Sequence, residues 1–153
     1  MIKFHSVVIF VKDIERSKLF YTEILEEEIE HDFGKNIMFK SGLSLWEIGK
    51  NHIIAQKVNT NNMGNRIELY FESEHLETIF EKLKTANTSF LHEIQEEPWG
   101  QRTLRFFDID NHLIEIGEPL PFFIRNMHNK GMSIEEIEKK SGVPLSTIKK
   151  ILE

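Results

Sequence analysis

The chain has 153 residues, 40% of them hydrophobic, and contains no cysteine. This length fits one globular domain with a small appendage, and the hydrophobic content is too high for a disordered chain. The net charge of -6 disfavours general binding to nucleic acid or acidic membranes, and the lack of cysteine excludes disulfides and thiolate metal ligands. Because no apolar run could span a bilayer and no signal peptide is visible, we expect a cytoplasmic protein.

The first half of the chain predicts one helix among four strands. Residues 2–11 are rich in β-branched and aromatic residues, which favours a strand. Asp13 is a candidate N-cap, and the apolar spacing after it predicts a helix over residues 14–24. Shorter strands are expected at about 26–33, 36–40 and 43–49, followed by an Asn-rich linker at 59–65.

The second half repeats this order. Strict alternation over 65–73 predicts a strand with Ile67, Leu69 and Phe71 on one face and Glu68 on the other. A helix is expected up to about Ala86, and three strands should follow at 88–96, 101–107 and 111–117. We therefore expect two modules, at about 2–58 and 65–118, within a domain that covers residues 1–118.

Residues 119–153 have a different pattern, which predicts a small helical appendage. Pro119 and Pro121 interrupt the strand pattern, and a short helix could follow. Ser133 and Glu136 have the spacing of a capping box, Gly142 should end that helix, and Pro144 should open the last one.

Part of the sequence of the first module recurs in the second. The segment Phe39-Lys-Ser-Gly-Leu-Ser-Leu-Trp-Glu-Ile-Gly49 returns as Phe107-Asp-Ile-Asp-Asn-His-Leu-Ile-Glu-Ile-Gly117, which aligns Glu47 with Glu115. By the same comparison His5 aligns with Glu68. Equivalent residues of a duplicated fold can converge on one point, so these four polar side chains are candidates for a shared site.

The repeated βαβββ order, with polar residues at these positions, resembles the vicinal oxygen chelate superfamily, which includes glyoxalase I, extradiol dioxygenases and the fosfomycin- and bleomycin-resistance proteins. The segment Pro98-Trp-Gly-Gln-Arg102, followed by Phe107 to Glu115, is similar to the second module of its glyoxalase-like branch. The resemblance implies an α+β fold of paired βαβββ modules that form a curved, cup-like mixed sheet.

The resemblance also implies a divalent metal ion, held by His5, Glu47, Glu68 and Glu115. Strand alternation independently predicts that Glu47, Glu68 and Glu115 point away from the helices. One imidazole and three carboxylates would suit Mn, Fe(II), Ni or Mg better than Zn or Cu. Glu47 or Glu115 could then detach from the ion and act as the general base.

Two further interpretations stay open. In metal-free relatives of the bleomycin-sequestering type, the same carboxylates would bond to arginines such as Arg66, Arg102 or Arg105. The third interpretation is a ligand-sensing regulator that binds DNA. The leading function is a metal-dependent lyase, isomerase or dioxygenase that acts on a small oxygenated or electrophilic metabolite.

A ligand-binding site is usually mostly apolar with a few polar groups. We expect the following residues to line it: Leu45, Tyr70, Trp99, Arg102, Leu104, Phe106 and Leu113.

The appendage resembles the helix-turn-helix of resolvase-type and regulatory proteins, with Pro144 to Leu152 as the recognition helix. Its lysines are balanced by glutamates, whereas DNA affinity depends on an excess of positive charge. We therefore expect no nucleic-acid partner. The appendage should instead pack on the cup or contribute to a homodimer interface.

Overall fold

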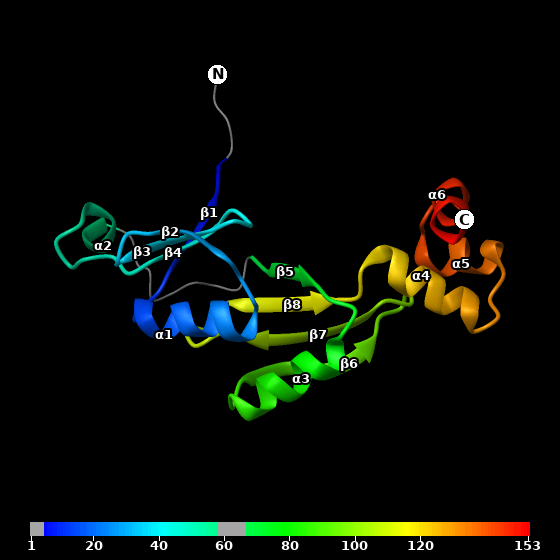
Figure 1. Cartoon of the computed structure of the whole chain (residues 1–153), viewed down its shortest axis with the longest axis horizontal. Coiled ribbons are helices and arrows are strands. Elements are labelled where there is room, and N and C mark those ends of the chain that lie inside the picture. Colours follow the sequence, from blue (N-terminus) through cyan, green and yellow to red (C-terminus); the bar gives the residue numbers. More distant parts are fainter. Residues whose placement is uncertain (1–4, 58–66) are drawn as a thin grey trace, which may run out of the picture. The chain divides into compact units, whose positions relative to one another are not determined.

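A computed structural model describes residues 5–57 and 67–153 of the chain. The described elements form two modules with the same order, strand–helix–three strands, followed by C-terminal helices (Figure 1). The α+β fold of paired βαβββ modules predicted from the sequence is confirmed. The expected linker at 59–65 lies outside the described residues. No helix in the described part of the chain is long and apolar enough to cross a membrane.

The first module is a four-stranded mixed sheet with helices against one face. Its strands are β1 (Val7–Phe10), β2 (Ile29–Asp32), β3 (Asn36–Phe39) and β4 (Leu43–Trp46), in the order β1-β4-β3-β2 with β1 parallel to β4. The helical segment between β1 and β2 is α1 (Ile14–Leu19) continued by a π-helical turn, η1 (Phe20–Ile24). Asp13 caps α1 as predicted, since its side chain accepts from the Arg16 N–H.

Helix and sheet of the first module meet in an apolar core. Tyr21 is fully buried and stacks on Phe39 of β3, while Ile37 and Leu45 are fully buried beside them. Residues Asp108–His112 also belong to this compact unit. The short helix α2 (Ile53–Lys57), which the sequence pattern did not predict, follows β4.

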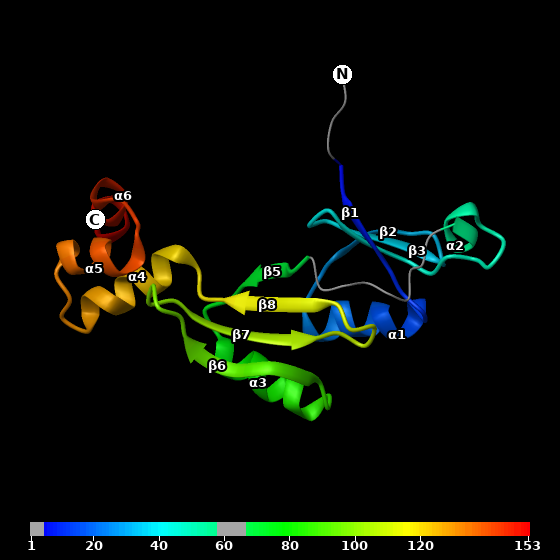
Figure 2. The ribbon, with the colours of Figure 1, turned by 180° about the vertical axis from the view of Figure 1, so that it is seen from behind.

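The second module repeats the same topology. Its strands are β5 (Leu69–Glu72), β6 (Ser89–Glu96), β7 (Arg102–Phe107) and β8 (Leu113–Gly117), in the order β5-β8-β7-β6 with β5 parallel to β8. Helix α3 (Leu76–Thr85) covers one face of this sheet (Figures 1 and 2). Under it, Phe80 contacts Phe90, which contacts Phe106, and Leu104, Phe106 and Ile114 are fully buried.

Three short helices follow β8: α4 (Leu120–Asn129), α5 (Ile134–Ser141) and α6 (Leu145–Leu152). They enclose a core of their own, made of Phe123, Ile124, Met127, Ile137 and Ile148. The capping box of Ser133 and Glu136 is present, and Gly142 ends α5 in the left-handed conformation with φ 72°. The predicted caps and helices of this tail are thus confirmed.

Strand register gives a different residue equivalence from the one that sequence letters suggest. Val8 pairs with Ser44 in the first sheet, and Tyr70 pairs with Glu115 in the second. At the ends of these strands, Val11 donates to the carbonyl of Trp46, as Ser73 does to that of Gly117. Ser44 is therefore the counterpart of Glu115. By the same register, Ser6 corresponds to Glu68 and Glu47 corresponds to Glu118.

Candidate ligand-binding site

The face of the second sheet opposite α3 carries a row of polar side chains across three strands. Glu115 of β8 is paired with Tyr70 on β5 and with Arg105 on β7. Because neighbouring residues of a strand point to opposite faces, these three side chains lie opposite the buried Ile114 and Ile116. The alternation that predicted this orientation for Glu115 and Glu68 agrees with the structure of this module.

Arg105 is the centre of this face. Its Nε donates to Glu68 Oε2 over 3.0 Å, and its Nη1 donates to Glu97 Oε1 over 2.6 Å. Nη2 forms an ion pair with Glu115, and Nη1 also lies 3.1 Å from His92 Nε2. One guanidinium thus bridges three carboxylates, in the fork geometry that suits arginine.

The electrostatic environment distinguishes two of these carboxylates. Burial raises the pKa of Glu115 above its ordinary value; the guanidinium of Arg105 opposes this, and the charges of Glu68 and Glu97 add to it. For Glu97, the hydrogen bond from Arg105 outweighs burial and lowers the pKa. Glu115 therefore has the stronger tendency to take up a proton, which is common for functional carboxyl groups.

Beside this centre, a chain of hydrogen bonds connects two aromatic side chains. Trp99 Nε1 donates to Gln101 Oε1 over 2.9 Å, and Gln101 Nε2 donates to the Tyr70 hydroxyl over 3.0 Å. The Tyr70 hydroxyl in turn donates to Glu72 Oε1 over 3.1 Å. A side chain at Gly117 would place its Cβ 2.6 Å from Gln101 Nε2, so the glycine makes room for this chain of bonds.

The residues predicted for a metal site fall into two pairs, one in each compact unit. In the first unit, His5 is exposed. Glu47 accepts from the Ile14 N–H over 2.9 Å and from Lys35 Nζ over 2.6 Å. Those bonds, first with Lys35 and then with Ile14, lower its pKa. Glu47 stands two residues after Leu45, on the helix-covered face, and this orientation differs from the predicted one.

In the second unit, Arg105 separates Glu68 from Glu115. Within residues 5–57 and 67–153, no group of three or more His, Asp or Glu side chains has the geometry to hold a metal ion. The acidic donor set of this unit is already neutralised in part by a guanidinium, and the register equivalents of Glu68 and Glu115 in the first unit are serines. Within this unit, Glu68 and Glu115 are both bonded to Arg105 and do not by themselves fit a resident metal ion, and we derive no chemical step from one.

The predicted lining residues divide between the two faces of their sheets. Leu45, Leu104 and Phe106 are fully buried on the helix-covered faces, so they belong to the cores and not to an open surface. Arg102 forms ion pairs with Glu118 and with Glu77 at the start of α3. Its guanidinium therefore connects β7 to α3 and to the end of β8 and does not line the proposed site. Tyr70 and Leu113 lie on the face of Glu115, and Trp99 joins it through Gln101.

Sequence reasoning missed two residues of the site, Glu97 and Gln101, and it missed the central role of Arg105. Arg105 had been named only as one possible partner for a carboxylate. The pairing of β7 with β8 is the signal that could have identified it, since two residues opposite each other on one face of an antiparallel pair interact directly.

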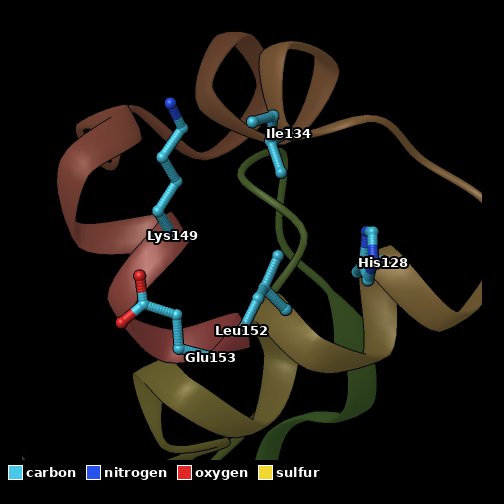
Figure 3. Close-up of a pocket in the computed structure, with 5 residues that line it drawn as sticks. All are labelled: His128, Ile134, Lys149, Leu152 and Glu153. Atoms are coloured by element: carbon cyan, nitrogen blue, oxygen red, sulfur yellow. The ribbon is translucent and has the colours of Figure 1, made fainter.

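The tail carries a separate shallow hollow of about 320 Å³, open to solvent (Figure 3). Its walls come from all three helices: His128, Ile134, Lys149, Leu152 and Glu153. Two of these side chains are apolar, and the others place charged or polar groups at the edge.

Residues 4–121 match the model of the glyoxalase-like domain family. This match spans more than half of the chain, which therefore belongs to that family and to the vicinal oxygen chelate superfamily that the sequence resembles. No protein in a search of curated sequences matches the chain.

Solved structures share the fold of this chain. A protein of unknown function from Agrobacterium tumefaciens is 32% identical, with a TM-score of 0.69, over 78% of this chain and 96% of the other. The fosfomycin resistance protein FosX from Listeria monocytogenes, solved with Mn(II) and sulfate, is 20% identical, with a TM-score of 0.60, over 84% of this chain and 100% of its own. TioX from Micromonospora is 16% identical, with a TM-score of 0.55, over 77% and 100%. The last two show the fold alone.

Proposed function

We propose that the chain binds a small molecule on the polar face of the second module, in a site with no resident metal ion. The observation that carries this proposal is the position of Arg105, whose guanidinium bonds to Glu68, Glu97 and Glu115. A cation of the protein itself occupies the place between the carboxylates. This corresponds to the metal-free, ligand-sequestering interpretation of the sequence.

The charge of this face and its exposed Tyr70 ring favour a cationic aromatic ligand. Glu68, Tyr70 and Glu72 alternate along the edge strand β5 and its N-terminal end, so the Tyr70 ring lies between two carboxylates. Tyr70 is 48% exposed, and its hydroxyl is held in place by Gln101. A planar cation stacked on this ring would gain cation–π attraction of about 0.5–1 kcal/mol at an exposed site, together with attraction to the carboxylates.

Benzamidine is a suitable probe, and benzoate is its anionic counterpart of nearly the same shape. Any ligand that binds only the folded state raises the melting temperature as its concentration increases. We expect a stabilising shift with benzamidine and none with benzoate. Tyr70→Ala should abolish this shift, whereas Glu135→Gln, an exposed carboxylate of α5, should leave it unchanged. Equal shifts with both probes, or none with either, would contradict the proposed ligand class.

The second candidate is the metal-dependent enzyme, a lyase, isomerase or dioxygenase that would use His5, Glu47, Glu68 and Glu115. The observation that favours it is the Mn(II) ion in the related FosX structure. It requires Arg105 to leave Glu68 and Glu115. Titration with MnCl2 separates the candidates: our proposal expects no thermal shift in the wild type, and a site that holds metal would give a saturable one that Glu115→Ala removes. The homodimer and the cytoplasmic location stay predictions.

A further inference from the structure

Two of the three C-terminal helices, α4 and α5, contact the turn that carries the aromatic edge of the proposed site. Gly100, between β6 and β7, has φ +94°, and a Cβ on it would lie 2.5 Å from Met127 Sδ of α4. Met127 itself is only 4% exposed. Its thioether therefore packs against the turn at Gly100, and a larger residue there would have to displace it.

An ionic contact fixes the neighbouring part of the same turn. Lys140 Nζ of α5 donates to Glu96 Oε1 at the end of β6 over 2.5 Å. This contact lowers the pKa of Glu96. The tail thus holds residues 96–100 through the apolar contact of Met127 and the ionic contact of Lys140, and Lys130 at the end of α4 lies 4.0 Å from the same Glu96 carboxylate.

Gln101 follows this turn at once and connects it to Tyr70. The side chain of Gln101 is almost fully buried and uses both of its polar atoms. Besides its bonds to Trp99 and Tyr70, Nε2 donates to the carbonyl of Glu118 over 2.8 Å. Glu118 directly precedes the start of α4 at Pro119. Gln101 is therefore held between the turn on one side and the entry to the tail on the other.

The geometry points to the tail as the element that positions the aromatic edge of the ligand site, with Met127 as the positioning residue: by packing on Gly100 it aims Trp99 and Gln101 at Tyr70. The consequence for ligand binding rests on the proposed function. The positioning itself does not, because it concerns contacts within the free protein. The family match ends at residue 121, so this role would be an addition to the family domain.

The fluorescence of Trp99 can report this role without any ligand. Trp46→Phe leaves Trp99 as the single tryptophan of the full-length chain. In this background we expect Met127→Ala to shift the Trp99 emission to longer wavelength and to increase its quenching by acrylamide, because the turn loses its support. Met127→Leu refills most of the lost volume and should restore the emission and quenching of the parent.

Ile137→Ala is the matched control, because Ile137 is fully buried in the same tail core and supplies none of the three atoms nearest to a Cβ at Gly100. It should lower stability about as much as Met127→Ala and leave Trp99 unchanged. An identical change of Trp99 in both variants, or no change in Met127→Ala, overturns the positioning role. In a second measurement, Met127→Ala should weaken benzamidine binding. If benzamidine fails to bind the wild type, the proposed function fails, while the Trp99 comparison still decides the positioning role.

Discussion

Glu47 and Glu118 occupy equivalent places in the two modules. The backbone N–H of Glu47 donates to the carbonyl of Lys35, and that of Glu118 donates to the carbonyl of Arg102. Each carboxylate then forms an ion pair with that same basic residue. The duplicated glutamates therefore join the last strand of each module to the third, and neither lies in the proposed ligand site.

The two glutamates differ in burial, which predicts different effects on stability. The Glu118 side chain is 2% exposed, whereas the Glu47 side chain is 26% exposed. Glu118→Gln removes the buried charge of this ion pair, and because Arg102 is partly exposed and keeps its pair with Glu77, we expect a loss of about 2 kcal/mol. Glu47→Gln weakens a bond to a helix start, at a typical cost of about 1 kcal/mol.

Urea denaturation measures both changes. Glu28→Gln, which removes an exposed carboxylate paired with Lys40, is the control and should leave the free energy of unfolding unchanged. Equal losses for Glu118→Gln and Glu47→Gln would show that burial does not determine how much each glutamate contributes to the free energy of unfolding.

Period-two alternation was enough to orient Glu68 and Glu115, because both sit in or beside strands with a clearly apolar opposite face. For Glu47 both the repeat alignment and the strand alternation gave the wrong face, for a physical reason. The sequence comparison aligns Gly49 with Gly117 and therefore Glu47 with Glu115. The strand register aligns Glu47 with Glu118 instead, so the two alignments differ by three residues. An odd shift moves a side chain to the other face of a sheet, and only the pairing of β4 with its neighbours reveals it.

The cluster around Arg105 was harder to predict. Glu68 and Glu97 are separated from Arg105 by 37 and 8 residues, and neither shows a spacing that marks a pair. Their proximity results from the order β5-β8-β7-β6, which a sequence pattern does not specify. The tail helices, in contrast, were predicted well because their caps are local signals.

A second prediction concerns a buried carboxylate in the first unit. Asp108 Oδ2 accepts from the Tyr21 hydroxyl over 3.0 Å and lies 2.7 Å from His112 Nδ1. Burial alone would raise the pKa of Asp108, but the hydrogen bond and charge of His112 outweigh it and lower this pKa. A lowered pKa in the folded state contributes stability above the unfolded value, about 3.9 for Asp, that is lost as pH falls through the folded value.

Asp108→Asn should remove this contribution. We expect the variant to be less stable than the wild type at neutral pH, with a difference that shrinks as the pH falls below about 4. Free energies of unfolding measured over the acidic range check this. Asp32→Asn, an exposed carboxylate paired with Lys18, is the comparison and should show a much smaller effect. If the difference in free energy of unfolding between Asp108→Asn and the wild type is the same at all pH values, the contribution of Asp108 to stability does not depend on its ionisation.

The third prediction concerns the charge of Arg105. Arg105→Gln leaves Glu68, Glu97 and Glu115 close together without their shared cation. Like charges in one site favour protonation, so the pKa of Glu115, already raised by burial, should rise further. A carboxyl pKa raised by folding contributes stability at low pH that is lost as pH rises through the folded value.

Arg105→Gln should therefore be destabilised most near neutral pH and should recover part of the loss near pH of about 4, where carboxylates take up protons. Unfolding by urea at both pH values checks the sign. Arg125→Gln, in the tail, removes a cation that has no carboxylate partner among the described residues, and should show no such recovery. A loss for Arg105→Gln that grows toward low pH would contradict the interpretation.

The last prediction concerns the tail and nucleic acid. In the tail, Gly142 ends α5 in the left-handed conformation, and α6 packs with α4 and α5 around a shared apolar core. On α6, the exposed Lys149 and Lys150 are the only basic residues, and the side chains of α5 include Glu135, Glu136 and Glu138. Each phosphate contact releases a counterion and steepens the dependence of affinity on salt, by about 0.9 in the log–log slope. Two lysines therefore support only weak binding.

We expect the full-length protein to show no submicromolar affinity for duplex DNA at physiological salt, and fluorescence anisotropy at several salt concentrations checks this. Tight, salt-sensitive binding that Lys149→Ala and Lys150→Ala together abolish would instead assign the tail to DNA recognition, and would revive the ligand-sensing regulator as the function of this chain.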